Sequence, residues 1–388
     1  MYIQRHISDR ILKSARTMPV VTITGPRQSG KTTLAKNLFP DYTYTNFELQ
    51  SNRDIFNADP IAFLKSPQKG IIIDEFQNLP EALSYIMVIS DENEIPGRYI
   101  LTGSQNFLML DKISQSLAGR TSLFNLPPFS IYELKDKNYG ETDANVYMYK
   151  GFYPRVYADE IDSHEWLLDY INLYLERDVR SILNVKDLSA FSLFLKLCAG
   201  RTAQALNLAS IADIVGRDIK TLRSWLSVLE TSYIVYLIQP YYRNFNKRLT
   251  KAPKLFFYDT GIVSTLLDIK TVAGLESHYL RGQLFENFVM SELMKYKINN
   301  GIRTDLYYWC DKAFAEIDCV FELNNKLNAI EIKSSSTYSG HFIKGLEKFH
   351  RLTAKEFGNG YVIYSGDDNF TVQDNYVIKW TELKQVFE

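Results

Sequence analysis

A glycine-rich segment between a strand-like run and a helix-like run constrains the fold of this chain more than any other feature. The segment extends from Gly25 to Thr32 and satisfies the pattern G-x-x-x-x-G-K-S/T. The residues from Val20 to Thr24 are apolar or β-branched, as in a buried strand. The residues from Lys31 to Phe39 have a helical pattern, which Pro40 ends. A strand, a loop and a helix in this order predict an α/β fold with a parallel sheet.

The chemistry of such a loop is phosphate binding, because its backbone N–H groups and the helix N-terminus favour anions. Lys31 is expected to reach the β- and γ-phosphates of ATP, and the hydroxyl of Thr32 is expected to hold Mg²⁺. The residues predicted to bind the nucleotide are Gly25, Pro26, Arg27, Gln28, Ser29, Gly30, Lys31, Thr32 and Thr33. The alternative is a glycine-rich turn that binds nothing.

A second apolar run, Ile71 to Ile73, ends in the carboxylates Asp74 and Glu75. In an enzyme with this phosphate loop, Asp74 would hold Mg²⁺, often through water. Glu75 would orient or deprotonate the attacking water. The spacing from Lys31 leaves room for one βαβ crossover, which supports this assignment. The alternative is an ordinary strand end with polar residues at its mouth.

Two further polar residues are candidates for the same site. The apolar run Tyr99 to Thr102 is followed by Ser104, which could sense the γ-phosphate, although a plain strand-to-helix turn fits as well. Arg120 follows a helical stretch from Asp111 to Leu117. It could act as an arginine finger on the γ-phosphate of a neighbouring subunit, which would require a homo-oligomer. A solvated arginine is the alternative.

Length, charge and cysteine content set further limits. The chain has 388 residues, 46% of them hydrophobic, which predicts a folded chain of about two to four domains. The net charge of −1 excludes a general nucleic-acid coat, so a DNA contact must be a local patch. Three cysteines without C-x-x-C spacing predict neither disulfides nor zinc, as in a reducing cytoplasm. No signal-peptide core and no apolar run of roughly 20 residues is present, so no membrane span is expected.

The pattern along the chain predicts three domains. Residues 1–150 form the α/β ATPase domain, residues 151–254 a helical connector with a winged helix, and residues 255–388 a C-terminal domain. In the middle domain, the helix-like stretch Ser210 to Val215, a turn at Gly216 and a second helix from Ile219 to Glu230 indicate a helix-turn-helix. A strand-like run from Tyr233 to Ile238 would be the wing.

Cations near this helix-turn-helix make DNA a candidate partner. Arg217, Lys220 and Arg223 would face outward, as in a recognition helix. The segment from residue 241 to 257 has no acidic residue and carries Arg243, Lys247, Arg248, Lys251 and Lys254 between aromatic residues. Cations bind phosphates and aromatic rings stack on bases. The alternatives are a winged helix used only for protein packing and an exposed basic linker.

The last third of the chain has a second candidate site. Glu286 lies in a helix-like stretch, while Asp318, Glu331 and Lys333 lie in two strand-like runs joined by Asn324-Asn325. A two-residue turn there pairs residues whose numbers sum to 649, so Asp318 faces Glu331. Two facing carboxylates repel each other unless a cation such as Mg²⁺ lies between them.

Other arrangements of this hairpin remain open. A turn one residue later places Asp318 opposite Lys333 as a cross-strand ion pair. A three-residue loop turns Asp318 to the wrong face. An amphipathic hairpin with a solvated charged face is also compatible with the pattern. In the Mg²⁺ arrangement, Lys333 would position or activate a water, as in D…E-x-K nucleases.

With these motifs assembled, the chain resembles a widespread family of bacterial and archaeal AAA-type ATPases with an uncharacterised C-terminal region. The resemblance covers nearly the whole chain and includes Gly25 to Thr32, Ile71 to Glu75, Thr102 to Ser104, Gly151 to Pro154, Tyr174 to Asp178, Phe257 to Gly261 and Gly282 to Leu293. It implies an AAA-type ATPase domain, a winged-helix segment and an α/β PD-(D/E)XK domain like that of restriction endonucleases. Glu286, Asp318, Glu331 and Lys333 occupy the positions that the resemblance assigns to a nuclease site.

Two functions follow from these predictions. In the first, the protein hydrolyses ATP, binds DNA through its winged helix and basic segment, and cuts DNA at the C-terminal carboxylates. In the second, ATP is turned over slowly and the C-terminal domain is a scaffold for protein or nucleic-acid partners. Glu75 helps to distinguish the two functions, because a carboxylate that orients the attacking water favours the function with ATP turnover.

Overall fold

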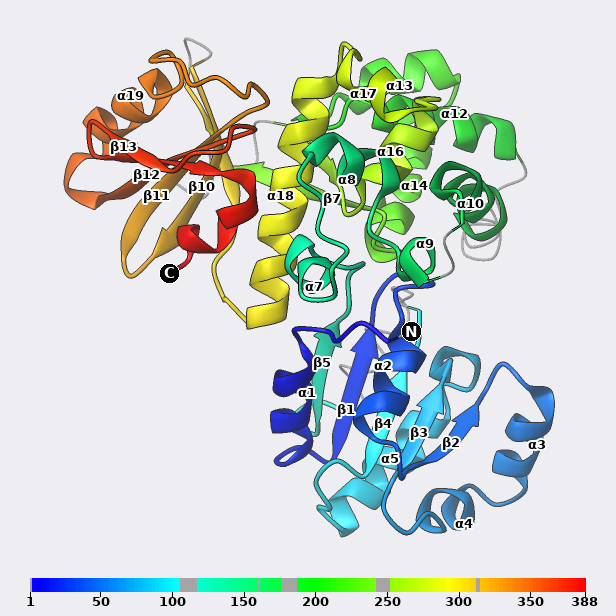
Figure 1. Ribbon diagram of the computed structural model, residues 1–388. Helices are drawn as coiled ribbons and strands as arrows, with labels where there is room; N and C mark the ends of the chain where they lie inside the picture. Colours follow the sequence, from blue (N-terminus) through cyan, green and yellow to red (C-terminus); the bar gives the residue numbers. More distant parts are fainter. Residues whose placement is uncertain (1, 105–116, 159–160, 176–186, 242–251, 312–314) are drawn as a thin grey trace.

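The structure is a computed structural model (Figure 1) that describes residues 2–104, 117–158, 161–175, 187–241, 252–311 and 315–388. The N-terminal sheet forms one body, and the central helices and the C-terminal sheet form a second body beside it. The long helix α18 (Arg281–Asn300) stands between the central helices and the C-terminal sheet, and its last turns point toward the N-terminal body. No helix in these ranges is both long enough and apolar enough to cross a membrane.

The N-terminal body is a five-stranded parallel sheet with the order β2-β3-β4-β1-β5. The strands are β1 (Val20–Thr24), β2 (Thr43–Asn46), β3 (Ile71–Asp74), β4 (Tyr99–Thr102) and β5 (Thr121–Asn125). The helices are α1 (Ser8–Ala15), α2 (Lys31–Leu38), α3 (Gln50–Ala58), α4 (Pro60–Lys65) and α5 (Ala82–Glu92). The predicted α/β class and parallel sheet are confirmed. Because β1, β3 and β4 are parallel neighbours, their carboxyl ends meet at one edge of the sheet.

The central region is mainly helical. Its helices are α7 (Ile131–Lys135), α8 (Ala144–Lys150), α9 (Pro154–Ala158), α10 (Ser163–Tyr170), α12 (Leu188–Ala199), α13 (Leu208–Val215), α14 (Ile219–Thr231), α16 (Thr260–Leu266) and α17 (Val272–Glu276). A π-helical turn, Ile171–Leu175, follows α10. Three short strands accompany these helices: β6 (Gln204–Ala205), β7 (Val235–Pro240) and β8 (Lys254–Phe257).

Capping side chains begin both helices of the stretch for which a helix-turn-helix was predicted, α13 and α14. Asn207 accepts the N–H of Ser210 at the start of α13, and Asp218 accepts the N–H of Thr221 at the start of α14. Gly216 ends α13 with φ 69°, a left-handed conformation that glycine adopts at little cost. The predicted strand begins two residues late, at Val235, because Tyr233 has φ 57°. The elements follow one another as α12, β6, α13, α14, β7 and β8, and β8 lies between β6 and β7 in the sheet.

The C-terminal sheet continues the strands of the central region. The nine-stranded order is β13-β14-β12-β11-β10-β9-β7-β8-β6. Its C-terminal members are β9 (Tyr307–Cys310), β10 (Glu316–Leu323), β11 (Lys326–Lys333), β12 (Phe357–Tyr364), β13 (Phe370–Val372) and β14 (Asn375–Lys379), with α19 (Lys344–Thr353) and a final 3-10 helix (Trp380–Val386). Parallel pairing of β7 with β9 joins the two regions, so the boundary expected after residue 254 falls within β8.

The hairpin between β10 and β11 has the register that the sequence predicts. Asn324 and Asn325 have φ 53° and 59°, as a two-residue turn requires. Leu323 pairs with Lys326, and Cys319 pairs with Ile330, so the paired numbers sum to 649. The next position of this register places Asp318 opposite Glu331, and both alternative turns are wrong.

Candidate functional site

The phosphate-binding loop connects β1 to α2 at the carboxyl edge of the N-terminal sheet. Gly25 has φ 148°, and a Cβ at this position would lie 2.3 Å from the carbonyl oxygen of Leu126, so only glycine fits. Gly30, with φ 92°, precedes the first residue of α2. The loop therefore directs the N-terminal N–H groups of α2 toward the space in front of it, as anion binding requires.

The loop carries two buried polar side chains, Lys31 and Ser29. The Lys31 Nζ donates to the carbonyl oxygens of Gly25 at 3.1 Å and Pro26 at 2.8 Å, and the side chain is buried. The Ser29 hydroxyl is fully buried and has no hydrogen-bond partner within the described residues. Since an unpaired buried hydroxyl is costly, a phosphate oxygen at the loop would satisfy Ser29 and attract Lys31.

The end of β3 provides the oxygen atoms for a metal ion. The Thr32 hydroxyl donates to Asp74 Oδ2 at 2.9 Å, and the Thr102 hydroxyl also donates to Asp74. The Tyr44 hydroxyl donates to the same carboxylate at 2.9 Å. Burial and the Asp74 carboxylate raise the pKa of Tyr44 to about 12, so its hydroxyl remains a donor. Thr32 and Asp74 supply the hard oxygen ligands that Mg²⁺ prefers, and they fit this ion.

Glu75 and Ser104 are brought together by a residue that the sequence analysis missed. The Gln77 Nε2 donates to the Glu75 carboxylate and lies 3.2 Å from the Ser104 hydroxyl. Glu75 itself has φ 52°, a strained conformation at the end of β3. A Cβ on Gly103 would lie 2.2 Å from Gln77 Oε1, so Gly103 makes room for this bridge. The pattern D-E-x-Q after a strand was the available signal.

Arg120 lies away from this group within the chain. It directly precedes β5, and its carbonyl oxygen accepts the N–H of Val20, the first residue of β1. Arg120 therefore lies at the edge of the sheet where β1 and β5 begin, whereas the phosphate-binding loop lies at the opposite edge, where β1 ends. Its guanidinium forms an exposed ion pair with Asp91. Arg120 contributes nothing to the site of its own chain, and only the trans role remains as a prediction.

A cavity of about 420 Å³ lies in front of the loop and includes Glu75 in its wall. Its far wall comes from the N-terminal segment and the central region: Tyr2, Ile3, Phe129, Tyr139, Pro154, Arg155, Tyr157 and Ala158. The sequence analysis did not assign these residues, although the resemblance included Gly151 to Pro154. Residues 176–178 of another segment in that resemblance lie outside the described residues. The cavity combines an anion-binding floor with an aromatic wall, which suits a nucleotide.

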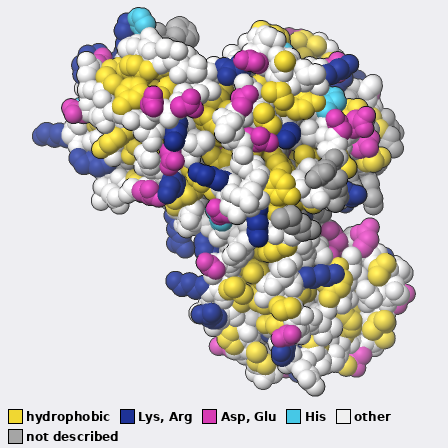
Figure 2. Space-filling model, in the orientation of Figure 1, with side chains coloured by type: hydrophobic (Ala, Val, Ile, Leu, Met, Phe, Trp, Pro, Cys, Tyr) yellow, Lys and Arg dark blue, Asp and Glu magenta, His cyan; other side chains and the backbone are white. Residues whose placement is uncertain are grey.

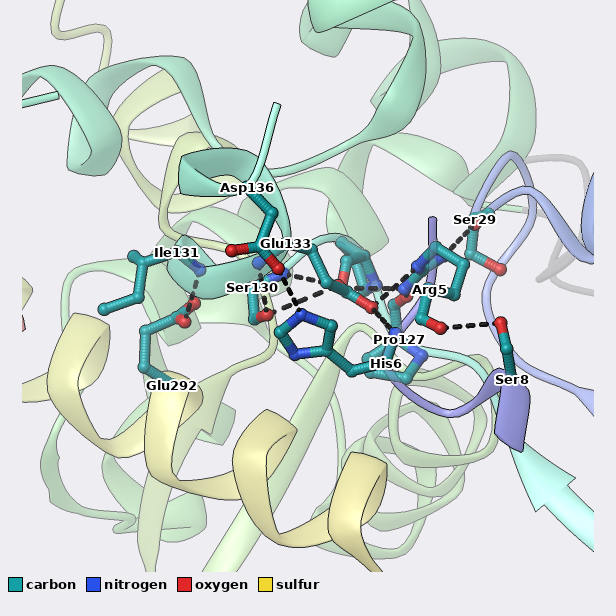
Figure 3. A network of polar contacts seen from close by, with 11 residues as sticks. Arg5, His6, Ser8, Ser29, Pro127, Ser130, Ile131, Glu133, Asp136 and Glu292 are labelled. Carbon is teal, nitrogen blue, oxygen red and sulfur yellow. Dashed lines mark hydrogen bonds and ion pairs between the residues drawn. The ribbon is translucent and has the colours of Figure 1, made fainter. Parts of the chain in front are cut away.

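The N-terminal segment contacts the loop through Arg5, which also lines the cavity (Figure 3). The Arg5 Nη1 donates to the carbonyl oxygen of Ser29 at 2.9 Å, and its Nε pairs with Glu133 Oε1 at 3.0 Å. Arg5 is 3% exposed and Glu133 is 0% exposed. Nothing in the sequence pattern around Arg5 predicted this role.

The four residues predicted for the C-terminal site lie near one another. The Lys333 Nζ lies 2.5 Å from Glu331 Oε2 and 3.7 Å from Asp318 Oδ2. Asp318 also accepts the N–H of Ile332 at 2.7 Å. Burial and the Asp318 carboxylate raise the pKa of Glu331 above its ordinary value, and the same causes act on Glu286 of α18.

Lys254 occupies this cluster, contrary to the prediction that it belongs to an exposed basic segment. It is 4% exposed, and its Nζ lies 2.8 Å from Glu286 Oε1 and also forms an ion pair with Glu316. Two carboxylates repel each other less when an ammonium group lies beside them. Lys254 is therefore a structural counter-ion and is not available to DNA.

The cluster does not fit a metal ion as it is arranged. Within the described residues, no group of three His, Cys, Asp or Glu side chains is placed to hold a metal. The ammonium group of Lys333 lies beside Asp318 and Glu331, where the predicted hairpin register implied Mg²⁺, and that of Lys254 lies beside Glu286 and Glu316. We therefore derive no cleavage step at these residues.

The predicted DNA-binding cations are only partly within the described residues. Arg217, Lys220 and Arg223 are exposed on and before α14, as expected, and Arg217 pairs with Asp187. Arg243, Lys247, Arg248 and Lys251 lie outside the described residues. Acidic and basic side chains are interspersed over the face shown in Figure 2.

Three family models match successive segments of the chain. Residues 17–135 match the family model of the AAA domain, residues 141–273 a domain of unknown function (DUF8612), and residues 281–383 another (DUF4143). Two uncharacterised proteins, one of Mycobacterium tuberculosis and one of Mycobacterium bovis, are 28% identical over 379 residues, covering 96% of this chain and 82% of theirs.

Solved structures with a similar chain path include ATPases. A Walker-type ATPase of Pyrococcus abyssi is 15% identical with a TM-score of 0.44, covering 68% of this chain and 96% of that chain. RuvB of Thermotoga maritima is 16% identical with a TM-score of 0.29, covering 59% and 86%. The AAA match supports ATP binding and hydrolysis by the N-terminal domain. The chain thus carries an N-terminal segment that matches the AAA domain, followed by two segments that match domains of unknown function.

Proposed function

We propose that the protein is a Mg²⁺-dependent ATPase that couples its nucleotide state to the binding of a partner, with DNA as the first candidate. The observation that carries the ATPase part is that Ser29, Lys31 and Thr32 line one cavity, while the Thr32 hydroxyl also donates to Asp74. Lys31 and the N–H groups of α2 would bind the β- and γ-phosphates. Thr32 and Asp74 would hold Mg²⁺, which neutralises phosphate charge when bound.

The base and ribose would lie against the aromatic wall of the cavity. Tyr2 and Ile3 enter from the N-terminal segment, and Tyr157 enters from α9. The Tyr2 hydroxyl is buried without a hydrogen-bond partner in the described part of the chain, so a polar ligand atom would satisfy it. Residues of two domains line this wall, which supports a change in their contacts when nucleotide binds.

Glu75 is the proposed water-orienting group. Gln77 holds its carboxylate and also contacts Ser104, so the ends of β3 and β4 share one polar bridge. Glu75 accepts hydrogen bonds, and an attacking water could donate one to it while Ser104 contacts the γ-phosphate. The residues would thereby orient the water and accept its proton.

Calorimetry with ATP and Mg²⁺ on the full chain tests the binding site. We expect Lys31→Ala to weaken ATP binding by about a hundredfold, since a charge-assisted contact to phosphate is lost. Lys36→Ala, on the same helix beyond the loop, is the matched control and should bind ATP as the native chain does. Equal affinity of native and Lys31→Ala chains would refute the assignment.

The second candidate is a nucleotide-dependent switch whose C-terminal domain binds partners without cutting them. The position of Lys254 between Glu286 and Glu316 favours this function over a nuclease, because the cluster already holds its own cations. Measured turnover decides between the candidates. Hydrolysis at a rate that partner binding changes supports an ATPase, whereas binding without turnover supports the switch.

A further inference from the structure

A continuous chain of buried polar contacts joins the phosphate-binding loop to α18 (Figure 3). Arg5 stands at its start, because its guanidinium contacts the backbone of the loop at Ser29 and the carboxylate of Glu133. The same guanidinium donates to the carbonyl oxygen of Pro127 at 2.6 Å. One side chain therefore joins the loop, the segment after β5 and the start of α7.

Glu133 continues the chain into α7. Its Oε2 accepts the N–H of Ser130 at 2.9 Å, and its Oε1 accepts the N–H of His6 at 2.8 Å. Burial alone would raise the pKa of Glu133, but Arg5 and these N–H groups outweigh it and hold the pKa below its ordinary value. Glu133 is therefore a carboxylate at neutral pH, and its position depends on Arg5.

The residue after Ser130 makes the connection to α18. The N–H of Ile131 donates to Glu292 Oε2 at 2.8 Å, and Glu292 Oε1 accepts from Lys295 at 2.7 Å. The Lys295 Nζ lies 3.6 Å from the centre of the Phe152 ring. Phe152 is two residues before Pro154, which lines the cavity. Helix α18 thus contacts both the support of the phosphate loop and the segment that closes the cavity.

The other half of α18 carries Glu286, which pairs with Lys254 in the C-terminal carboxylate cluster. A single helix therefore touches the supports of both sites. Buried ion pairs have few alternative arrangements of low energy, which gives a physical route by which a shift at one end of such a chain could be felt at the other.

We propose that Arg5 is a positioning residue of the phosphate-binding loop, and that α18 senses bound nucleotide through Arg5, Glu133 and Glu292. The inference rests on the proposed function, since it requires ATP at the loop. Phosphate binding acts on the backbone of Ser29, and Arg5 passes this change to α7 and α18. The C-terminal domain thereby receives the nucleotide state of the AAA domain through a buried route.

The test combines ATP calorimetry with amide hydrogen exchange of the full chain, with and without Mg²⁺ and ATP. In the native chain we expect ATP to protect residues 31–38 and also residues 281–300. Arg5→Lys keeps the charge but cannot hold Ser29, Pro127 and Glu133 at once. It should weaken ATP binding by about tenfold and abolish the ATP-dependent protection of α18.

A matched control exists at Arg10. Its guanidinium donates to the carbonyl oxygen of Ile298 at 2.5 Å, so it also joins the AAA domain to α18. It takes no part in the chain that starts at Ser29. Arg10→Lys should therefore keep ATP affinity within about twofold and keep the protection of α18. Glu292→Gln, a second variant, should retain ATP binding and lose most of the α18 response, because its charge no longer holds Lys295.

The outcomes separate the two claims. If the native chain binds no ATP, the proposed function fails and this inference fails with it. If ATP binds and protects α2 but leaves α18 unchanged, the site assignment stands and the link to α18 is wrong. If Arg5→Lys behaves like Arg10→Lys in both measurements, Arg5 does not position the loop. Should Arg5→Lys unfold, Glu292→Gln still decides whether the response of α18 passes through Glu292.

Discussion

The Thr32 hydroxyl donates to the Asp74 carboxylate over 2.9 Å, so the start of α2 and the end of β3 meet at one point. The two residues are 42 positions apart, and the parallel pairing of β3 and β4 and of β4 and β1 brings them together. Thr102 and Tyr44 donate to the same carboxylate from β4 and β2. Asp74, at the end of β3, is therefore the common acceptor for donors from two other strands and one helix.

Asp74→Asn should raise the Mg²⁺ concentration needed for half-maximal ATP hydrolysis by about tenfold, since a charged oxygen ligand near the ion is replaced by a neutral one. A magnesium titration of turnover measures this. Tyr44→Phe is the control, because it removes one donor and leaves the carboxylate in place. An unchanged magnesium profile in Asp74→Asn would exclude Asp74 from the metal site.

Glu75→Gln should lower ATP turnover by about a hundredfold or more and leave ATP affinity near the native value, because a water-orienting carboxylate acts in the reaction and not in binding. Gln77→Leu should show a smaller loss of turnover, since Glu75 would lose the amide that holds it. Steady-state kinetics and calorimetry on the same preparations separate the effects. A large loss of ATP affinity in Glu75→Gln would show a binding role instead.

Lys254→Met should destabilise the chain by about 3 kcal/mol, because Glu286 and Glu316 would lose their buried cation. Mn²⁺ should restore part of the unfolding temperature of this variant and leave that of the native chain unchanged. Adding Asp318→Asn should remove the restoration. Mn²⁺ binding by the native chain that disappears in Asp318→Asn, or Mg²⁺-dependent DNA cleavage that does so, would contradict the counter-ion role of Lys254.

DNA binding, measured by fluorescence anisotropy, should weaken steeply between about 50 and 200 mM salt, because phosphate contacts displace condensed counter-ions. Arg223→Ala should reduce the magnitude of the slope of log affinity against log salt concentration by about 1, which corresponds to the loss of one phosphate contact. Lys65→Ala on α4, which also removes an exposed cation, should leave the slope unchanged. A flat salt response would argue against contacts to the DNA backbone.

Glu133→Gln should lower the unfolding temperature at pH 7, because Arg5 loses its buried partner. The native pKa of Glu133 is depressed, so its stabilising effect is complete above the ordinary pKa of about 4.3 and is lost as pH falls. The difference between native and Glu133→Gln chains should therefore narrow from pH 7 to pH 4. Thermal unfolding at both pH values measures it, and a constant difference would show that the charge of Glu133 is unimportant.

The sequence determined the features that depend on neighbouring residues. The strand, loop and helix around Gly25 to Thr32, the strand ending at Asp74, and the hairpin register at Asn324-Asn325 appear as predicted. Turn conformation, strand alternation and helix periodicity act over a few residues, and a sequence states them directly.

Only the tertiary structure decided which distant residues share a site. Arg5 reaches Glu133 across 128 positions, and Ile131 reaches Glu292 across 161. The sequence predicted Lys254 to be one more cation of an exposed basic segment. In the structure, Lys254 belongs to β8, which joins the C-terminal sheet through β7, and it is buried beside Glu286. These contacts depend on how sheets and helices pack, and an ion pair buried in this way leaves no periodic pattern along the chain.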